Sequence, residues 1–156
     1  MQTCEIDAAE WVGPYNDLAF GFHQIAKYYY YPGWQEPGPT LEFIINKQAL
    51  ESLPDDLKAI VESAARAANQ NMLDEYTARN NAALIELVET HGVQVKKLPD
   101  DVLAELQRIS TMVVDEMAAE NPLAKRITDS MRAFAQQSKA YHGISEEAYY
   151  KARGQD

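Results

Sequence analysis

The sequence predicts a helix-rich α/β protein with long helices and two or three short strands. A periodic apolar stripe without proline or glycine runs over 55–91 and indicates one very long helix. Short aromatic or alternating runs at 28–31 and 93–98 have the composition of strands. Hydrophobic residues make up 46% and charged residues 24% of the 156 residues, which is normal for a folded domain.

The first third of the chain alternates short elements with irregular backbone. Spaced apolar residues favour a short helix over 16–27, and the tyrosine run 28–31 follows it as a strand. Prolines and glycines crowd into 32–39, so this segment is expected to be a loop. The apolar run 41–46 predicts a buried strand.

The remainder is mostly helical, with a start signal used twice. At 53–57 and again at 98–102, a leucine and a proline precede two aspartates, which favour the first turn of a helix. The first helix would be about 50 Å long, at about 1.5 Å per residue. Asn121 and Pro122 predict the cap of a further helix over 122–141, with a short last helix from Ser145.

Charge and cysteine content exclude several classes of protein. The formal net charge is −10, and no basic stripe offsets it, so a nucleic-acid partner is not expected. Cys4 is the single cysteine and excludes an intramolecular disulfide. No apolar run approaches the roughly 20 residues that span a bilayer. No signal peptide is visible, and the first residues resemble the interior of a protein, so we expect 1–156 to be a fragment.

The sequence offers little for catalysis, and we expect the protein not to be an enzyme. His23, His91 and His142 are far apart and lack metal-ligand spacing. Nucleophile elbows, phosphate-binding glycine loops and Walker-type lysines are absent from the sequence. A hydrolase would need an activated nucleophile, and none is found. The paired carboxylates stand at predicted helix starts, where capping explains them: 55–56, 100–101 and 146–147.

Two aromatic motifs have a different character. Glu10 and Trp11 stand before a Gly-Pro pair, and an aromatic, an amide and a carboxylate follow one another at 34–36 in the Pro/Gly-rich loop. Irregular backbone leaves carbonyl oxygens free, and carboxylate and carbonyl oxygens are ligands for hard cations. From residue types alone, a small hydrophobic cluster beneath two loops with solvated glutamates explains the same pattern.

A resemblance favours the first interpretation. Residues 6–17 and 27–38, IDAAEWVGPYND and KYYYYPGWQEPG, closely resemble the solute-binding proteins of TRAP transporters. The nearest branch is DctP-like and binds 2-oxo acids and related monocarboxylates. The resemblance covers essentially 5–156 and only the C-terminal half of a family member. It implies part of a two-lobed, periplasmic-binding-protein-like fold (class II type) that captures an organic acid for membrane uptake.

The resemblance also implies roles for individual residues. Glu10 is similar to a metal-binding carboxylate, Trp11 to a residue that gives its backbone carbonyl, and Glu36 to a second carboxylate ligand. Trp11 and Trp34 would be apolar walls for the ligand. The implied cofactor is Na⁺ or Ca²⁺, which an isolated fragment need not retain. A cation between the carboxylates would bridge the protein and a small carboxylate ligand that they would otherwise repel.

The same resemblance implies partners, a compartment and a division of the chain. Membrane subunits of a TRAP transporter, the periplasm and a homodimer formed through the long helices 54–91 and 122–141 are expected. The family's ligand-clamping arginine and metal-binding glutamine lie upstream of this chain, so it would hold half a site. Functionally, 5–53 would carry the ligand and metal loops and 54–156 the helices. The alternative is a helical dimerisation or scaffold module without a ligand site.

Overall fold

The computed structural model describes residues 5–38 and 41–154, and the chain forms two compact units, Met1–Leu98 and Pro99–Asp156. This structural boundary lies later in the chain than the predicted division between residues 53 and 54. That division separates the ligand loops from the helices by function and stays a prediction. The prediction of a helix-rich α/β chain with long helices and short strands is confirmed. None of the helices described is long and apolar enough to cross a membrane.

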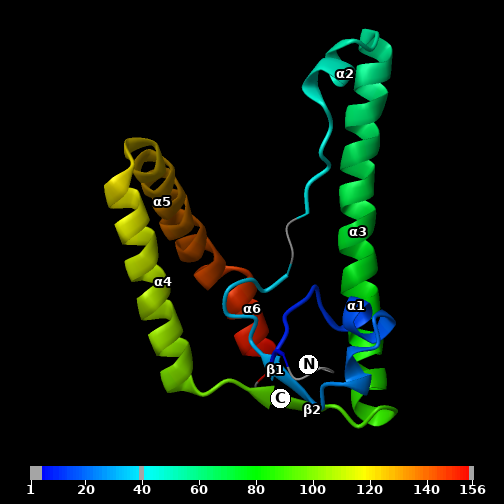
Figure 1. Cartoon of the computed structure of the whole chain (residues 1–156), viewed down its shortest axis with the longest axis vertical. Helices are drawn as coiled ribbons and strands as arrows, with labels where there is room; N and C mark the ends of the chain where they lie inside the picture. The colour runs from blue at the N-terminus through cyan, green and yellow to red at the C-terminus, as the bar shows by residue number, and fades with distance from the viewer. Residues whose placement is uncertain (1–4, 39–40, 155–156) are drawn as a thin grey trace. The chain divides into compact units, whose positions relative to one another are not determined.

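The first unit is built on the long helix α3, Asp55–Glu89 (Figure 1). Its 35 residues confirm the uninterrupted helix predicted from the apolar stripe. Two aspartates occupy its first turn, where their charge is favourable against the helix dipole. At its C-terminal end the chain turns at Gly92, and the amide of Val93 donates to the carbonyl of Leu87 (2.9 Å).

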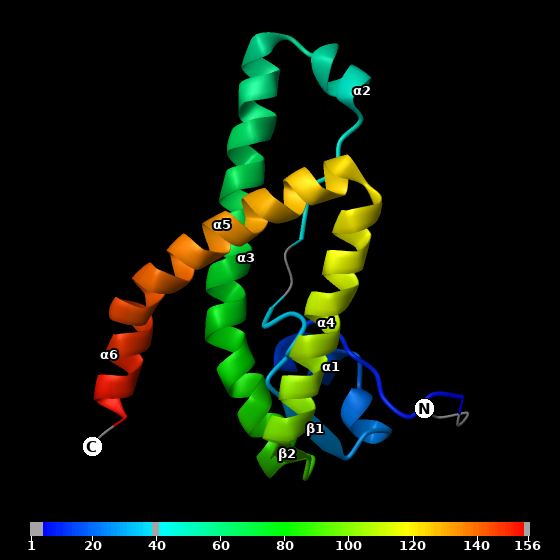
Figure 2. The ribbon, with the colours of Figure 1, turned by 90° about the vertical axis from the view of Figure 1, so that its left-hand side faces the viewer.

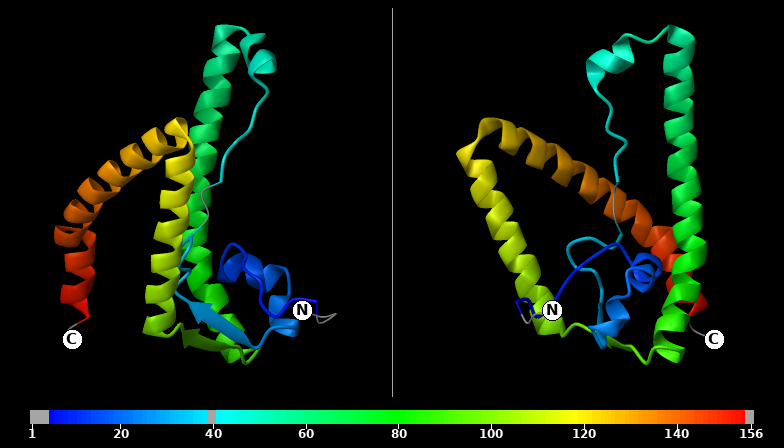
Figure 3. Two further views of the ribbon diagram at one scale, coloured as in Figure 1. Left: turned by 60° about the vertical axis from the view of Figure 1, so that its left-hand side comes forward. Right: turned by 45° about the vertical axis from the view of Figure 1, so that its right-hand side comes forward.

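The two strands lie side by side near the C-terminal end of α3 (Figure 3). Strand β1, Tyr28–Tyr31, pairs in parallel with β2, Gln94–Lys97, so that Tyr28 lies opposite Gln94. Both strands were predicted. The buried apolar residues of this unit gather at the same end, where α3 turns into β2: Ala83, Leu87 and Val93.

Two predicted elements differ from the structure. The helix expected over 16–27 is divided into α1, Pro14–Ala19, and the 3₁₀ turn η1, Phe22–Gln24. Between them Gly21 has a left-handed backbone (φ 73°), which ends α1 at a position that the apolar spacing did not reveal.

The buried strand predicted over 41–46 is wrong. The segment has no regular structure, and Ile44 is 81% exposed. A strand needs a neighbour to bond with, and the sheet of the described residues contains β1 and β2 alone. Helix α2, Lys47–Glu51, follows and lies beside the N-terminal end of α3 (Figure 2).

The second unit contains α4, Asp100–Glu120, α5, Pro122–Ile144, and α6, Glu146–Arg153. The side chain of Asn121 caps α5 by accepting hydrogen bonds from the amides of Leu123 (2.8 Å) and Ala124 (3.3 Å), as predicted. Helix α5 continues to Ile144, three residues beyond the predicted end at residue 141. An ion pair between Arg132 Nη1 and Asp115 Oδ1 (2.6 Å) joins α5 to α4.

Candidate functional site

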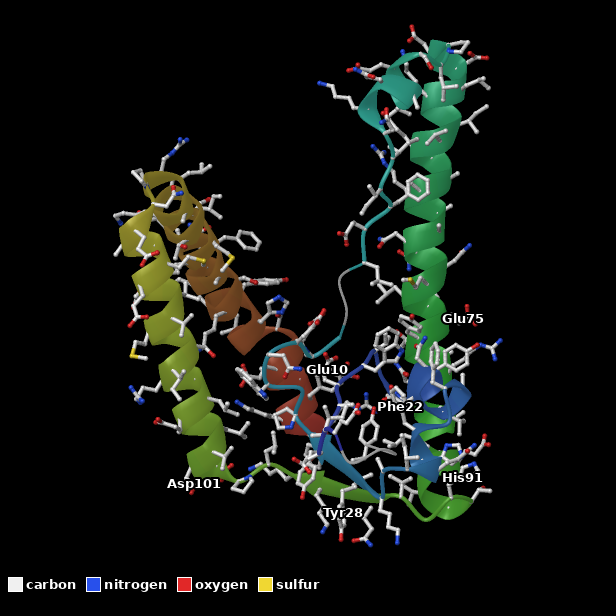
Figure 4. All side chains as sticks on the ribbon, viewed as in Figure 1. Glu10, Phe22, Tyr28, Glu75, His91 and Asp101 are labelled. Atoms are coloured by element: carbon white, nitrogen blue, oxygen red, sulfur yellow. The ribbon has the colours of Figure 1, made fainter. Side chains whose placement is uncertain are left out.

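The first tryptophan motif leads into α1, which is anchored to the C-terminal half of α3. The backbone amide of Tyr15 donates to Asn80 Oδ1 (3.0 Å), and the Tyr15 hydroxyl donates to Glu75 Oε1 (3.2 Å). Arg79 forms an ion pair with the same Glu75 oxygen (2.8 Å), and its guanidinium lies 5.4 Å from the centre of the Tyr15 ring. Figure 4 places Glu75 on α3 beside α1. These contacts fix α1 on α3.

Within α1, Asp17 is a buried carboxylate, 7% exposed, bonded to β1. The Tyr29 hydroxyl donates a 2.6 Å hydrogen bond to Asp17 Oδ2, a short distance typical of bonds to a charged acceptor. Burial raises the pKa of Asp17 and of Tyr29 above their ordinary values, and the bond to Asp17 raises that of Tyr29 further. Asp17 Oδ1 and Asn16 Oδ1 are also buried, without hydrogen-bond partners among the described residues.

Glu10 and Trp11 precede α1 and remain exposed to solvent. Trp11 is 51% exposed and packs edge-to-face against Phe20, with ring centres 5.7 Å apart. The charge of Glu10 contributes to the raised pKa of Asp17, so the two carboxylates lie within electrostatic reach of each other. A cation beside Glu10 would therefore also act on Asp17.

The second motif follows β1 in a tightly folded loop. The peptide bond between Tyr31 and Pro32 is cis. At Gly33 a Cβ atom would lie 2.5 Å from the carbonyl oxygen of Glu36, closer than real Cβ atoms come, so the loop folds back on itself here. Trp34 is 45% exposed, and Glu36 is exposed as well. The loop presents an aromatic face and a carboxylate to solvent.

The donor chemistry of these motifs fits a hard cation, but the described residues do not complete a site. Two carboxylates and a backbone carbonyl are oxygen ligands of the kind that Na⁺ and Ca²⁺ take. Among the residues described, however, no group of three or more His, Cys, Asp or Glu side chains gathers to hold a metal ion. Glu10, Trp11 and Glu36 therefore stay predicted ligands, and Trp11 and Trp34 predicted ligand walls.

The fold brings together two histidines that the sequence analysis treated as separate. His23 in η1 and His91 after α3 stack with ring centres 3.9 Å apart, and His91 Nε2 lies 3.7 Å from Glu86 Oε1. Figure 4 places His91 at the C-terminal end of α3. Since the two residues are distant in sequence, no local spacing signals the pair. Stacked rings do not aim their nitrogens at one point, so the pair is a packing contact.

Exposed carboxylates beside half-exposed tryptophans, next to α1 and β1, are features of a binding protein. The profile of the bacterial extracellular solute-binding proteins of family 7 (DctP) matches residues 1–121, and the chain belongs to this family. The family consists of binding proteins and not enzymes, which confirms the prediction of a nonenzymatic protein. The resemblance to TRAP solute-binding proteins is confirmed with it.

Two relatives show how much of such a protein the chain represents. It is 38% identical over 144 residues to the monocarboxylate 2-oxoacid-binding periplasmic protein of Nostoc sp. strain PCC 7120, covering 92% of this chain and 39% of the relative. It also resembles the TRAP transporter solute binding protein from Bordetella bronchiseptica RB50, with a TM-score of 0.92 and 33% identity, over 97% of this chain and 45% of that one. The chain therefore spans less than half the length of either protein.

The Bordetella structure is described as a mixed occupancy dimer. One active site holds copurified calcium and picolinate, and the other is apo. These are properties of that protein. Calcium is a cation that carboxylate and carbonyl oxygens bind, and these are the donor groups that the two tryptophan motifs offer.

Proposed function

We propose that this chain is part of a TRAP-type solute-binding subunit that captures a small organic acid, such as a 2-oxo acid, in the periplasm for membrane uptake. The proposal assigns Glu10, Trp11 and Glu36 to a bridging cation, Na⁺ or Ca²⁺. It assigns Trp11 and Trp34 to the apolar walls of the ligand site. The membrane subunits of the transporter are the proposed partners of the loaded protein.

One observation carries this proposal: both tryptophans stay about half exposed beside exposed carboxylates, in a member of a solute-binding family. Trp11 and Trp34 are 51% and 45% exposed, although large aromatic side chains gain most from burial. Aromatic walls with a few polar groups are typical of small-molecule sites. The relatives named for 2-oxoacid binding and for bound picolinate support a carboxylate as the ligand class.

The cation answers an electrostatic objection to this assignment. Two carboxylates and a net charge of −10 repel an anionic ligand. A cation held by Glu10 and Glu36 reverses the local charge and offers coordination positions to the carboxylate of the ligand. Because the chain spans 39% of the Nostoc relative, further ligands, such as the arginine that the family uses, would come from residues outside this chain.

Calorimetry on the natural gene product that carries these 156 residues tests the proposal. Pyruvate, as a simple 2-oxo acid, would be titrated in sodium buffer and again with calcium present. We expect cation-dependent binding that Glu10→Gln abolishes. The matched control Glu120→Gln removes one carboxylate at the end of α4 and leaves binding unchanged. Full cation-dependent binding by the Glu10 variant would show that the site assignment is wrong.

A second proposal concerns assembly. We propose that the helices carry a homodimer contact, as the family resemblance implies. On α5, exposed apolar side chains recur at helical spacing along one stripe: Leu123, Ile127, Met131 and Phe134. Phe134 is 70% exposed and Met131 62%. The description of the Bordetella relative as a dimer supports a second copy as the occupant of such a stripe.

A further inference from the structure

The two tryptophan motifs are held by different elements. Trp11 precedes α1, and the amide of Asp17 donates to the carbonyl of Gly13 (2.9 Å), which ties the segment after Trp11 to the first turn of α1. The 33–36 loop instead follows β1. The distance between the motifs therefore depends on how α1 is joined to β1.

Most contacts of α1 and β1 join each element to a different neighbour. Helix α1 is bonded to α3 through Tyr15 and Asn80, and β1 pairs with β2 through its backbone. The side-chain bond that directly links α1 to β1 runs from the Tyr29 hydroxyl to Asp17 Oδ2 at 2.6 Å. Since Asp17 is 7% exposed, little water can replace a lost donor there.

We propose that the hydrogen bond between Tyr29 and Asp17 sets the relative position of Glu10 and Glu36, with Tyr29 as the positioning residue for the cation site. This inference rests on the proposed function. Tyr29 touches neither cation nor ligand. It acts by fixing α1, which follows the segment with Glu10, relative to the strand that leads into the 33–36 loop. Cation affinity then depends on a hydroxyl group remote from the oxygen ligands.

An electrostatic coupling gives this proposal a readout that a merely structural contact lacks. The charge of Glu10 is one of the causes that raise the pKa of Asp17. A cation bound at Glu10 would offset that charge and lower the pKa of Asp17. Carbon-13 NMR of the Asp17 carboxyl group should therefore show its titration midpoint moving to lower pH on saturation with calcium.

Calcium titration of the natural gene product, with and without pyruvate, tests the proposal. We expect Tyr29→Phe to weaken calcium binding by about tenfold, because the two motifs lose the bond that fixes their relative position; tenfold corresponds to about 1.4 kcal/mol. Tyr30→Phe removes the same hydroxyl from an exposed position on the same strand and should change the affinity by less than about twofold. Unchanged calcium affinity in a folded Tyr29→Phe protein overturns the proposal.

A second measurement works without metal. The chain has two tryptophans, one in each motif, so their indole N–H signals report each motif separately by NMR. Tyr29→Phe should shift both indole signals, whereas Tyr30→Phe should leave the Trp11 indole signal unchanged. If Tyr29→Phe does not fold, Asp17→Asn serves instead. Its amide oxygen can still accept the bond from Tyr29, so the indole signals should move less than expected for Tyr29→Phe.

The two hypotheses fail in different ways. If the unmodified protein binds neither calcium nor pyruvate, the proposed function falls, and the indole signals still decide whether Tyr29 positions the motifs. Indole signals that do not move in the Tyr29 variant overturn the positioning role. If Glu10→Gln loses calcium binding and Tyr29→Phe binds calcium as the unmodified protein does, the proposed function stands. The positioning role of Tyr29 is then wrong.

Discussion

At the scale of single residues, the buried pair of Asp17 and Tyr29 is the most unusual feature. A carboxylate that is 7% exposed is uncommon in a protein whose other acidic side chains mostly face solvent. It follows the Gly13–Pro14 break and precedes the left-handed Gly21, so the short helix between them holds it against β1. The local backbone thus accounts for the position of this buried carboxyl group.

The raised pKa of Asp17 predicts a pH dependence of stability with a definite sign. The fold favours the protonated carboxyl, so this contribution is complete below the unfolded pKa of about 3.9 and is lost as pH rises through the higher folded value. As pH rises from the unfolded to the folded pKa of Asp17, the unmodified chain should lose unfolding free energy relative to Asp17→Asn. Above the folded pKa, the difference between the two proteins should stay constant. Urea unfolding of both proteins from pH 3.5 to 7 measures this. Stability of the unmodified chain that rises with pH relative to Asp17→Asn would contradict the assignment.

Gly33 offers a second prediction at this scale. A methyl group there would meet the Glu36 carbonyl at 2.5 Å, so Gly33→Ala must open the loop. We expect the Trp34 indole signal to move and calcium affinity to fall by about tenfold, a cost of about 1.4 kcal/mol. Gly38→Ala is the matched control, because a Cβ at that position meets nothing within 4 Å. Equal calcium affinity for both variants would mean that the loop geometry is irrelevant to the site.

At the scale of elements, the long helices followed from the sequence and the short elements near the site did not. The apolar stripe and the Pro-Asp-Asp starts set α3 and α4 almost to the residue because these signals are local. The strand predicted over 41–46 failed because a strand depends on a partner, which local sequence does not reveal. Similarly, Glu10 and Glu36 were predicted as ligands from their motifs, whereas the bond of Tyr29 to Asp17 depends on tertiary contact and has no local signal.

The cap of α5 gives a prediction for an element. Asn121 Oδ1 satisfies two amides that the helix cannot bond itself, so Asn121→Ala should destabilise the first turn by about 1 kcal/mol. Hydrogen exchange at Leu123 and Ala124 should then be about fivefold faster. Gln136→Ala, an exposed change in the middle of the same helix, should leave those two amides unaffected. Unchanged exchange in the Asn121 variant would show that the cap contributes nothing.

At the scale of the whole molecule, the central question is how much of a solute-binding protein this chain supplies. It covers 39% of the Nostoc relative and 45% of the Bordetella chain, and it carries both tryptophan motifs. Metal ligands must converge to within about 2.3–2.6 Å of one calcium ion, so two carboxylates and a carbonyl leave positions for groups from elsewhere. The proposed site is therefore shared between this chain and other residues.

The apolar stripe on α5 leads to a prediction about assembly. A second copy related by a twofold axis would bury the same stripe on both chains, because an isologous interface uses one surface twice. Phe134 is the most exposed member at 70%, so Phe134→Glu would place a charge against its own counterpart or a neighbouring apolar side chain. Such an unpaired buried charge costs several kcal/mol.

Sedimentation equilibrium should therefore show the unmodified protein as a dimer and Phe134→Glu as a monomer, with a dissociation constant raised by at least about a hundredfold. Gln136→Glu adds the same charge to the opposite side of α5 and should remain dimeric. Because the proposed cation site is in a different compact unit, the monomeric variant should keep its calcium affinity. Dimerisation unaffected by Phe134→Glu would place the contact elsewhere, and simultaneous loss of calcium binding would tie the site to the interface.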